Sequence, residues 1–453
     1  MVNYKFPKEA LNWLEQLLID RLGVKLQLNY IDACLVLTVD GTSIVFDQLN
    51  KKFVFGGEIS FTKWDCSAEG FLGLISDELP TPGLIEEGGG VFQFENQMCI
   101  VSYDLMGLIY WALNRVEELE KNELDKHQRF KASSSHAVKH GYLERPFIDE
   151  WLDILGQVVI RLNPNLSLKK HKAQMFLSHD VDQPAQYAFN SWATALRMAS
   201  SYLLRQKSIK KACRPIWQKL ISYKEISLDD PYNTFDLLMD LSEKKGIKSS
   251  FYFIAGGNNK NYDASYRLTD RRIHKLLLEI DRRGHEIGLH SSYEMFNLDG
   301  GISKEMKSLK AVCSALGIKQ SYWGGRMHYL RWSHPKTLFE CESAGMSYDT
   351  TLGYAELPGF RCGTCFEYLA FDPIEKKRLN IRIRPLIVME STIIEEEYLG
   401  LGKGKEARRK ILHLKRICNK VNGNFSLLWH NSSLTTVELK KMYMDIVNDN
   451  NIS

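Results

Sequence analysis

The sequence predicts an α/β protein in which a small α+β region precedes a larger region of parallel strands and outer helices. Three observations predict this class. The first 130 residues combine one amphipathic helical pattern with several strand-length apolar pieces. From about residue 172, strand-like and helix-like segments alternate along the chain. Polar side chains follow several of these strands, at the place where parallel α/β folds gather their reacting groups.

Composition places the chain among ordinary globular proteins. With 453 residues, 44% hydrophobic and 25% charged, it is long enough for two or three domains. A net charge of +4 argues against a dedicated nucleic-acid binder, which needs a concentrated basic surface. The start "MVNYKFPKEALNWLEQ" lacks a secretory signal and no apolar run reaches membrane-spanning length, so we expect a cytoplasmic protein. The nine cysteines, among them the close pair Cys362 and Cys365, are expected to be reduced thiols in packing or loop positions.

Residues 1–130 are predicted to form a small α+β domain of unknown role. "ALNWLEQLLIDRLG" has helical apolar spacing, whereas "KLQLNY", "CLVLTVDG", "SIVFDQ" and "QFENQMCIVSYD" have the length and pattern of strands. "LMGLIYWALNRVEELEKNELDKH" is predicted to be one long helix, and we find no catalytic constellation in this domain. Residues 131–171 are predicted to be a polar linker or exposed loop followed by the helix "PFIDEWLDILGQVVIRL".

Residues 172–440 carry the repeated strand–helix pattern. The predicted strands lie in "AQMFLSHD", "KSSFYFIAGG", "HEIGLH", "SYWGGRMHYL", "MSYDTTLGY" and "NGNFSLLWHN". A helical stretch rich in lysine and arginine, residues 185–232, interrupts the pattern. We interpret it as a solvated helical excursion; the alternative is a surface that meets an anionic polymer or membrane headgroups.

The first candidate site is "FLSHDVDQP". On an extended chain Asp180 and Asp182 point to one side, while His179 points to the other. Two carboxylates this close repel each other unless a cation lies between them or one stays protonated. One carboxylate on a divalent metal, with the other beside it as a proton acceptor, is therefore the chemical interpretation; a polar turn is the alternative.

Three further segments supply candidate residues. In "GHEIGLHSSYE", His290 ends a strand and Glu294 follows four residues later, so a helical turn would let both bind one metal ion. In "WGGRMHYLRW", Arg326 could orient a carboxylate and keep it ionised, and His328 is another candidate ligand. In "LLWHN", His430 ends an apolar strand and suits general acid or base work near neutral pH.

Taken in this order, these stretches resemble the motifs of the polysaccharide deacetylases, the carbohydrate esterase superfamily that includes chitin and chitooligosaccharide deacetylases. The resemblance covers roughly residues 172–440, and "GHEIGLH" is its most specific element. It implies an incomplete, distorted βα barrel. It also implies a metal-dependent hydrolase that removes an acetyl group, N-acetyl in our interpretation, from a sugar of a bacterial surface polysaccharide or its precursor.

The resemblance also implies roles for individual residues. Asp180 would be the catalytic base, oriented by Arg326, and His430 the catalytic acid. Asp182 and His290 would bind a divalent metal ion, which we expect to be Zn²⁺. The partner would be an acetylated carbohydrate; no nucleic acid is expected, and the oligomeric state stays open.

Two departures from the family pattern affect the metal site. Glu294 stands where the family has its second metal histidine, and the arginine motif continues as "RMHYL" without the family's prolines. We expect His328 to be the third ligand, with Glu294 as its competitor. A catalytically silent sugar-binding or assembly protein, and a metal-independent amide hydrolase of the same superfamily, remain the alternatives. Aromatic side chains that could stack on a sugar, or simply pack in the core, are Tyr293, Trp323, Tyr329 and Trp429.

Overall fold

A nine-stranded sheet forms the centre of the molecule. The computed structural model describes residues 4–84, 90–119, 123–257, 259 and 261–449. The strand order is β13-β14-β12-β11-β10-β9-β8-β16-β15, and every neighbouring pair is parallel except β13 and β14. The strands are β8 (Gln174–Val181), β9 (Ser250–Ile254), β10 (Glu286–Ser291), β11 (Gly324–Met327), β12 (Tyr348–Asp349), β13 (Tyr368–Asp372), β14 (Lys377–Ile383), β15 (Val388–Met389) and β16 (Asn424–Leu428).

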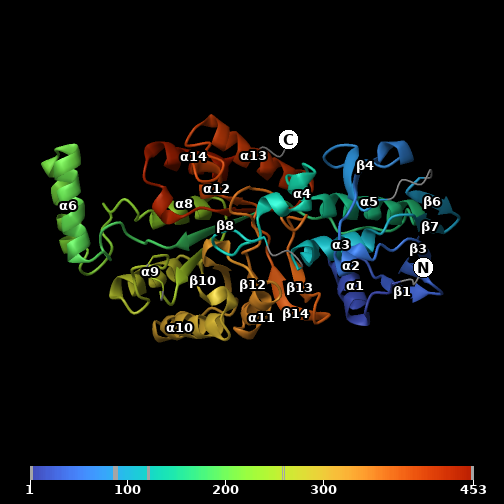
Figure 1. Ribbon diagram of the computed structural model, residues 1–453, viewed down its shortest axis with the longest axis horizontal. Coiled ribbons are helices and arrows are strands. Elements are labelled where there is room, and N and C mark those ends of the chain that lie inside the picture. Colours follow the sequence, from blue (N-terminus) through green and yellow to red (C-terminus); the bar gives the residue numbers. More distant parts are fainter. Residues whose placement is uncertain (1–3, 85–89, 120–122, 258, 260, 450–453) are drawn as a thin grey trace.

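The sheet curls into a half-barrel and leaves β13 and β15 as its two edges. The central strands β9, β10 and β11 are wholly buried, because helices cover the outside of the curl (Figure 1). The α/β class expected from the strand–helix pattern is therefore confirmed. The covering helices are α8 (Phe235–Lys244), α9 (Arg271–Arg282), α10 (Gly301–Ala315), α11 (Lys336–Ser343), α12 (Glu390–Ile394), α13 (Lys405–Lys420) and α14 (Val437–Asn448).

The N-terminal region adds a second sheet at one end of the elongated molecule (Figure 1). Its five strands have the order β1-β2-β3-β7-β6, and β4 pairs separately with β5. The strands are β1 (Gln27–Ile31), β2 (Cys34–Val39), β3 (Thr42–Phe46), β4 (Phe61–Asp65), β5 (Glu78–Pro82), β6 (Phe92–Glu95) and β7 (Met98–Val101). The helices are α1 (Lys8–Leu22), α2 (Lys52–Phe55), α3 (Leu105–Leu113), α4 (His136–Lys139) and α5 (Phe147–Leu162).

The prediction of one long helix from residue 105 onward is wrong. Helix α3 ends at Leu113, and Arg115 takes a left-handed conformation with φ of 50°. The buried Arg115 guanidinium turns back to form ion pairs with Glu117 and Glu118. The chain then forms a short 3-10 turn, Val116–Glu118, instead of continuing the helix. Residues 120–122 of the expected helix lie outside the described residues.

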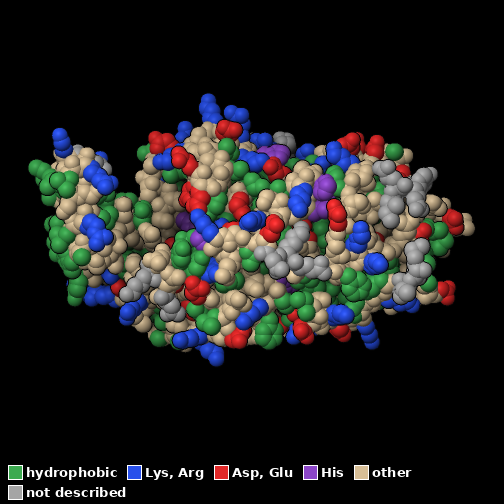
Figure 2. All heavy atoms as spheres, in the orientation of Figure 1, with side chains coloured by type: hydrophobic (Ala, Val, Ile, Leu, Met, Phe, Trp, Pro, Cys, Tyr) green, Lys and Arg blue, Asp and Glu red, His purple; other side chains and the backbone are tan. Residues whose placement is uncertain are grey.

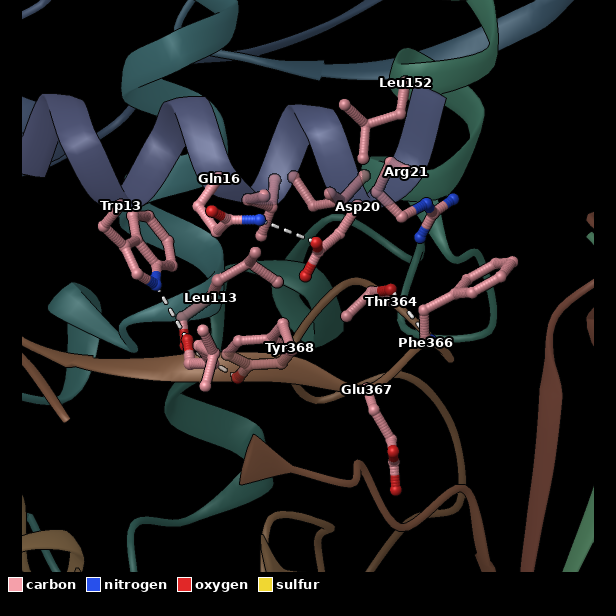
Figure 3. Close-up of a pocket in the computed structure, with 13 residues that line it drawn as sticks. Trp13, Gln16, Asp20, Arg21, Leu113, Leu152, Thr364, Phe366, Glu367 and Tyr368 are labelled. Atoms are coloured by element: carbon pink, nitrogen blue, oxygen red, sulfur yellow. Dashed lines mark hydrogen bonds between the residues drawn. The ribbon is translucent and has the colours of Figure 1, made fainter. Parts of the chain in front are cut away.

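Helix α1 packs directly on the edge of the half-barrel. The indole Nε1 of Trp13 donates a hydrogen bond to the carbonyl of Leu369 in β13 over 2.7 Å (Figure 3). A cavity of about 20 Å³ lies beside this contact, which is room for about one water molecule. We therefore assign this cavity to the packing between α1 and the half-barrel and not to a binding site.

The structure also places the predicted linker and the predicted basic insertion. The segment expected to be a linker or exposed loop, residues 131–145, is buried at about half of its positions, Ala132, His136 and Tyr142 among them. The basic segment forms two helices, α6 (Trp192–Gln206) and α7 (Ile209–Ile221), and α6 projects from the end opposite the N-terminal region (Figure 1). No helix in the described part of the chain has the length and apolar character needed to span a membrane.

Candidate active site

A polar pocket of about 540 Å³ opens at the carboxyl ends of the central strands. Its floor holds Asp180 and Asp182 from the end of β8, His290 from β10, His328 after β11 and His430 after β16. The parallel register explains how residues far apart in sequence meet here, because His290 in β10 pairs directly with Arg326 in β11.

Asp180 is held as a charged acceptor by Arg326. Nη1 of Arg326 lies 2.7 Å from Oδ1 of Asp180, and both side chains are buried. The guanidinium is itself fixed, since it donates to the hydroxyl of Ser178 and to the carbonyl of Thr350. Burial alone would raise the pKa of Asp180, but Arg326, with help from His290 and His430, lowers that pKa below its usual value.

Asp182, His290 and His328 bring three potential metal-ligating atoms together. One carboxylate oxygen and one ring nitrogen from each histidine all lie within 4.8 Å of one another. The Asp182 Oδ1 atom is 3.2 Å from Nε2 of His290 and 3.6 Å from Nε2 of His328. This oxygen is buried, yet it has no hydrogen-bond partner of proper geometry among the described residues. A cation between the three atoms would supply the missing partner.

The other ring nitrogens of the two histidines support that interpretation. Nδ1 of His290 lies 3.0 Å from the carbonyl oxygen of Arg326, which can only accept, so this nitrogen carries the proton. Nδ1 of His328 faces the carboxylate of Asp263 at 3.4 Å. When each imidazole is neutral and carries its proton on Nδ1, each Nε2 atom has a lone pair that points toward Asp182. Metal-binding histidines have the same arrangement, with one ring nitrogen on the metal and the other donating to an acceptor. The residues present therefore fit a divalent metal ion.

The same electrostatics appear in the pKa of His328. Burial lowers this pKa, but the carboxylates of Asp182 and Asp263 outweigh burial and raise it to about 9. Reciprocally, burial would raise the pKa of Asp182, yet the two histidines hold it well below its usual range. Two carboxylates beside this imidazole thus favour positive charge at this point of the pocket.

Glu294 lies outside the cluster. Its side chain is 53% exposed and forms an ion pair with Arg331 over 3.3 Å. Its second oxygen accepts a hydrogen bond from Asn259. The chain after His290 does not turn helically at once: it stays extended through Ser291 and then turns at Tyr293 and Glu294, and Glu294 does not line the pocket.

His430 is oriented by a residue that the sequence analysis missed. The Oε1 atom of Glu390 lies 2.7 Å from Nδ1 of His430 and also accepts the backbone N–H of that histidine. Glu390 is buried, and the hydroxyl of Ser433 donates to the same oxygen. Burial lowers the pKa of His430, but Glu390 and then Asp182 raise it to about 10, so the imidazole is protonated at neutral pH. Glu390 follows the apolar run "LIVM", a strand-end signal equivalent to those used above.

The chain just after His328 adopts a strained turn. Tyr329 and Leu330 have φ of 60° and 55°, a region that side chains other than glycine rarely occupy. Nη1 of Arg129, from the N-terminal region, donates to the carbonyl of Tyr329 over 3.0 Å. Arg129 also lines the pocket, where Asp125 pairs with its Nε atom at 2.7 Å. The sequence offered no strand-end or motif signal for either Arg129 or Asp263.

The expected aromatic residues separate into two groups. Tyr329 lines the pocket together with Tyr262 and Tyr398. Trp429 is fully buried, and Tyr293 lies behind Tyr262 with their rings stacked 4.2 Å apart. Trp323 and the strand-end residue Asp349 are also buried and do not line the pocket. His179 faces away from the pocket and contacts the carbonyl of Trp429 through Nδ1.

Comparisons with known proteins give distant likenesses. A family of unknown function, DUF7033, matches residues 14–164 and so ends before β8. None of the curated proteins matches the chain. Among solved structures, a protein assigned as a polysaccharide deacetylase from Mycobacterium smegmatis has a TM-score of 0.37 and 15% identity, covering 62% of this chain and 86% of its own. PuuE allantoinase has a TM-score of 0.36 and 10% identity, covering 61% and 83%. The names of both neighbours denote hydrolases, but at these scores the chemistry has to come from the site itself.

Proposed function

We propose that the protein is a metal-dependent hydrolase that removes an N-acetyl group from a sugar of a bacterial surface polysaccharide or its precursor. One observation carries this proposal. A buried carboxylate with a lowered pKa, a cluster that fits a divalent metal ion and a protonated histidine all face one polar pocket. Hydrolysis of an amide needs these three functions: activation of water, polarisation of the carbonyl and protonation of the leaving nitrogen.

Asp182, His290 and His328 would hold the metal. One carboxylate and two imidazoles are a donor set that suits Zn²⁺ with positions left open. A divalent ion held there would supply Lewis-acid polarisation to water and to an acyl carbonyl in the pocket. Asp263 and the Arg326 carbonyl would fix the ring orientations of the two histidines, since each faces the Nδ1 atom that the metal does not use.

Asp180 and His430 would move the protons. Asp180, kept ionised by Arg326, takes a proton from the water as its oxygen attacks the acyl carbon. His430 then gives its Nε2 proton to the sugar nitrogen as the carbon–nitrogen bond breaks, which leaves acetate and a free amine. Glu390 suits His430 to that task because it fixes the ring and stabilises the protonated form.

The pocket lining favours a hydroxylated substrate. Amide and hydroxyl side chains surround the floor, and the tyrosines Tyr262, Tyr329 and Tyr398 offer ring faces on which a sugar could stack. A volume of about 540 Å³ falls in the usual range of small-molecule sites. Long apolar walls, which a fatty acyl substrate would need, are not present among the described lining residues.

Acetate release tests this proposal. The protein, loaded with Zn²⁺, should release acetate from at least one member of a panel of N- and O-acetylated sugars. Asp180→Asn should abolish release while Zn²⁺ binding persists, because Asp180 is not part of the metal cluster. Full activity of this variant would refute the assigned base. Binding of sugars without any acetate release would favour a silent sugar-binding protein, and ring opening of cyclic amides by metal-free protein would favour the metal-independent amide hydrolase.

A further inference from the structure

The helical hairpin formed by α6 and α7 has an unusual surface for a solvated excursion. Of the 22 large hydrophobic side chains exposed among the described residues, ten lie between Trp192 and Leu228. Leu204 is 78% exposed, Ile209 72% and Trp217 62%. An exposed apolar patch of this density marks a surface that meets something less polar than water.

These side chains follow helical spacing and form faces. Trp192, Leu196 and Leu203 lie on one side of α6, at steps of four and seven residues. Ile209 and Trp217 share a face of α7 in the same way, eight residues apart. Figure 2 shows hydrophobic side chains along the outer edge of this lobe with Lys and Arg side chains beside them.

The charge of the same segment is wholly positive. From Gln183 to Lys224 the chain has eight basic residues and no acidic one, so the remainder of the chain has a net charge of −4. A second copy of this hairpin would bring like charges together, which disfavours self-association through it. A nucleic acid would satisfy the charges but would leave the leucine and isoleucine side chains without an apolar partner. An anionic membrane surface satisfies both, since its headgroups attract cations and its acyl boundary accepts apolar and aromatic side chains.

We propose that the α6–α7 hairpin docks the protein on a membrane surface that carries anionic lipid. The apolar faces insert at the headgroup boundary, and the lysines and arginines bind the lipid phosphates. Trp192 combines an apolar ring with a neighbouring cation, since Nζ of Lys219 in α7 lies 5.3 Å from its ring centroid. This combination suits the headgroup boundary, where the ring meets the acyl chains and the cation meets the phosphates.

Docking would also hold the pocket near the membrane. The hairpin begins just after β8, and Gln183, Ala185 and Asn190 at its base line the pocket. Two contacts anchor this base: Lys219 donates to the carbonyl of Asn190, and Arg272 of α9 donates to the carbonyl of Ala188. The hairpin is thus attached to the pocket wall, and its docking is independent of which bond the pocket hydrolyses.

Vesicle co-sedimentation tests the proposal. The full chain should bind vesicles of equimolar phosphatidylglycerol and phosphatidylcholine, bind pure phosphatidylcholine vesicles at least about tenfold more weakly, and dissociate as salt is raised. Cys213 is the exposed cysteine of the described chain and lies on α7, so an environment-sensitive fluorophore on this thiol should shift to the blue on binding.

Matched variants decide whether the hairpin is responsible. Leu204→Ser with Trp217→Ser should weaken partition at least about tenfold, because each change removes apolar area from the lipid boundary. Lys210→Ser with Lys211→Ser should weaken it about fivefold per lysine. The control, Leu72→Ser with Val437→Ser, changes side chains that are 78% and 79% exposed elsewhere and should bind like the wild type. All three proteins should keep the wild-type melting temperature, since the replaced side chains are exposed.

Three results would overturn the proposal. One is equal binding to both kinds of vesicle, or none to either. Another is equal loss of binding in the control pair. The third is evidence for a different occupant of this surface. Such evidence would be a concentration-dependent dimer that the Leu204 and Trp217 changes abolish, or tight binding of a DNA duplex by protein that does not bind vesicles.

Discussion

Replacing His328 with alanine should weaken Zn²⁺ binding far more than replacing Glu294 with alanine. His328 is 5% exposed at its side chain and turns Nε2 toward the Asp182 carboxylate. Glu294 points away from the cluster and is held by Arg331. The sequence favours His328 as the third ligand with Glu294 as its competitor, and this comparison tests that preference directly.

The expected magnitudes follow from the position of each side chain. Loss of an outer partner of a metal ligand costs about 10- to 100-fold in affinity. Loss of a direct ligand from a three-residue set should cost at least the upper end of that range, about 100-fold or about 3 kcal/mol. Asp263→Asn, which removes the negative charge facing Nδ1 of His328 but leaves His328 itself in place, should fall between the two. Glu294→Ala should change affinity less than about twofold, because no ligand or outer partner is lost.

Titration of metal-free protein with Zn²⁺ against a fluorescent competing chelator measures these affinities without reference to activity. The order of dissociation constants should be His328→Ala, then Asp263→Asn, then Glu294→Ala and wild type together. The melting temperature of each metal-free variant shows whether the fold is kept. A Glu294→Ala variant that loses Zn²⁺, beside a His328→Ala variant that retains it, would refute the assigned ligand set.

Three further predictions test the supports of the site. Glu390→Gln should lower kcat by about 100-fold or more with little change in Zn²⁺ affinity. The reason is that the general-acid contribution of His430 depends on the orientation that Glu390 gives its ring. An unchanged kcat would contradict this role. Arg326→Met should lower the free energy of unfolding, measured by denaturant titration, by about 3–5 kcal/mol, because Asp180 would keep a buried charge without its partner. A change below about 1 kcal/mol would contradict the importance of this buried pair. Burial lowers the pKa of His179 to about 4 in the folded chain. Between pH of about 6.5 and about 4, His179 therefore binds a proton in the unfolded chain but not in the folded chain. The raised pKa values of His328 and His430 have the opposite effect on stability, so the prediction concerns the difference between two proteins. The free energy of unfolding of the wild type minus that of His179→Gln should fall by about 2 kcal/mol from pH 7 to pH 5, and a difference that does not change with pH would contradict this role of His179.

The strands of the half-barrel were predictable where an apolar run ends in polar residues. Strands β8, β10 and β16 each show that pattern, and parallel packing then brings their carboxyl ends to one edge. Strand β14 has an alternating pattern, with burial on every second side chain near its end, but no polar functional residue marks it. Its sequence therefore gives no sign of its place in the main sheet, where it pairs with β12.

The ligand at the third position could not be decided from the sequence. Spacing allows Glu294 to reach a metal only if the chain turns helically at once after His290. The structure instead continues extended through Ser291 and turns at Tyr293 and Glu294, where the buried Arg331 pairs with the carboxylate of Glu294. Arg331 is 37 residues from Glu294 along the chain, so its effect on that turn belongs to tertiary packing and not to local pattern.

The position of His328 depends on the N-terminal region in a similar way. His328 reaches the pocket because the next two residues turn back in a conformation that costs about 1–3 kcal/mol each. Such a turn persists only if its surroundings fix it, and Arg129 does so through the carbonyl of Tyr329 while Asp125 holds the guanidinium. A segment without any catalytic motif therefore helps to set a candidate metal ligand. The region matched by the family of unknown function contains this segment and supplies Arg129 to the pocket lining.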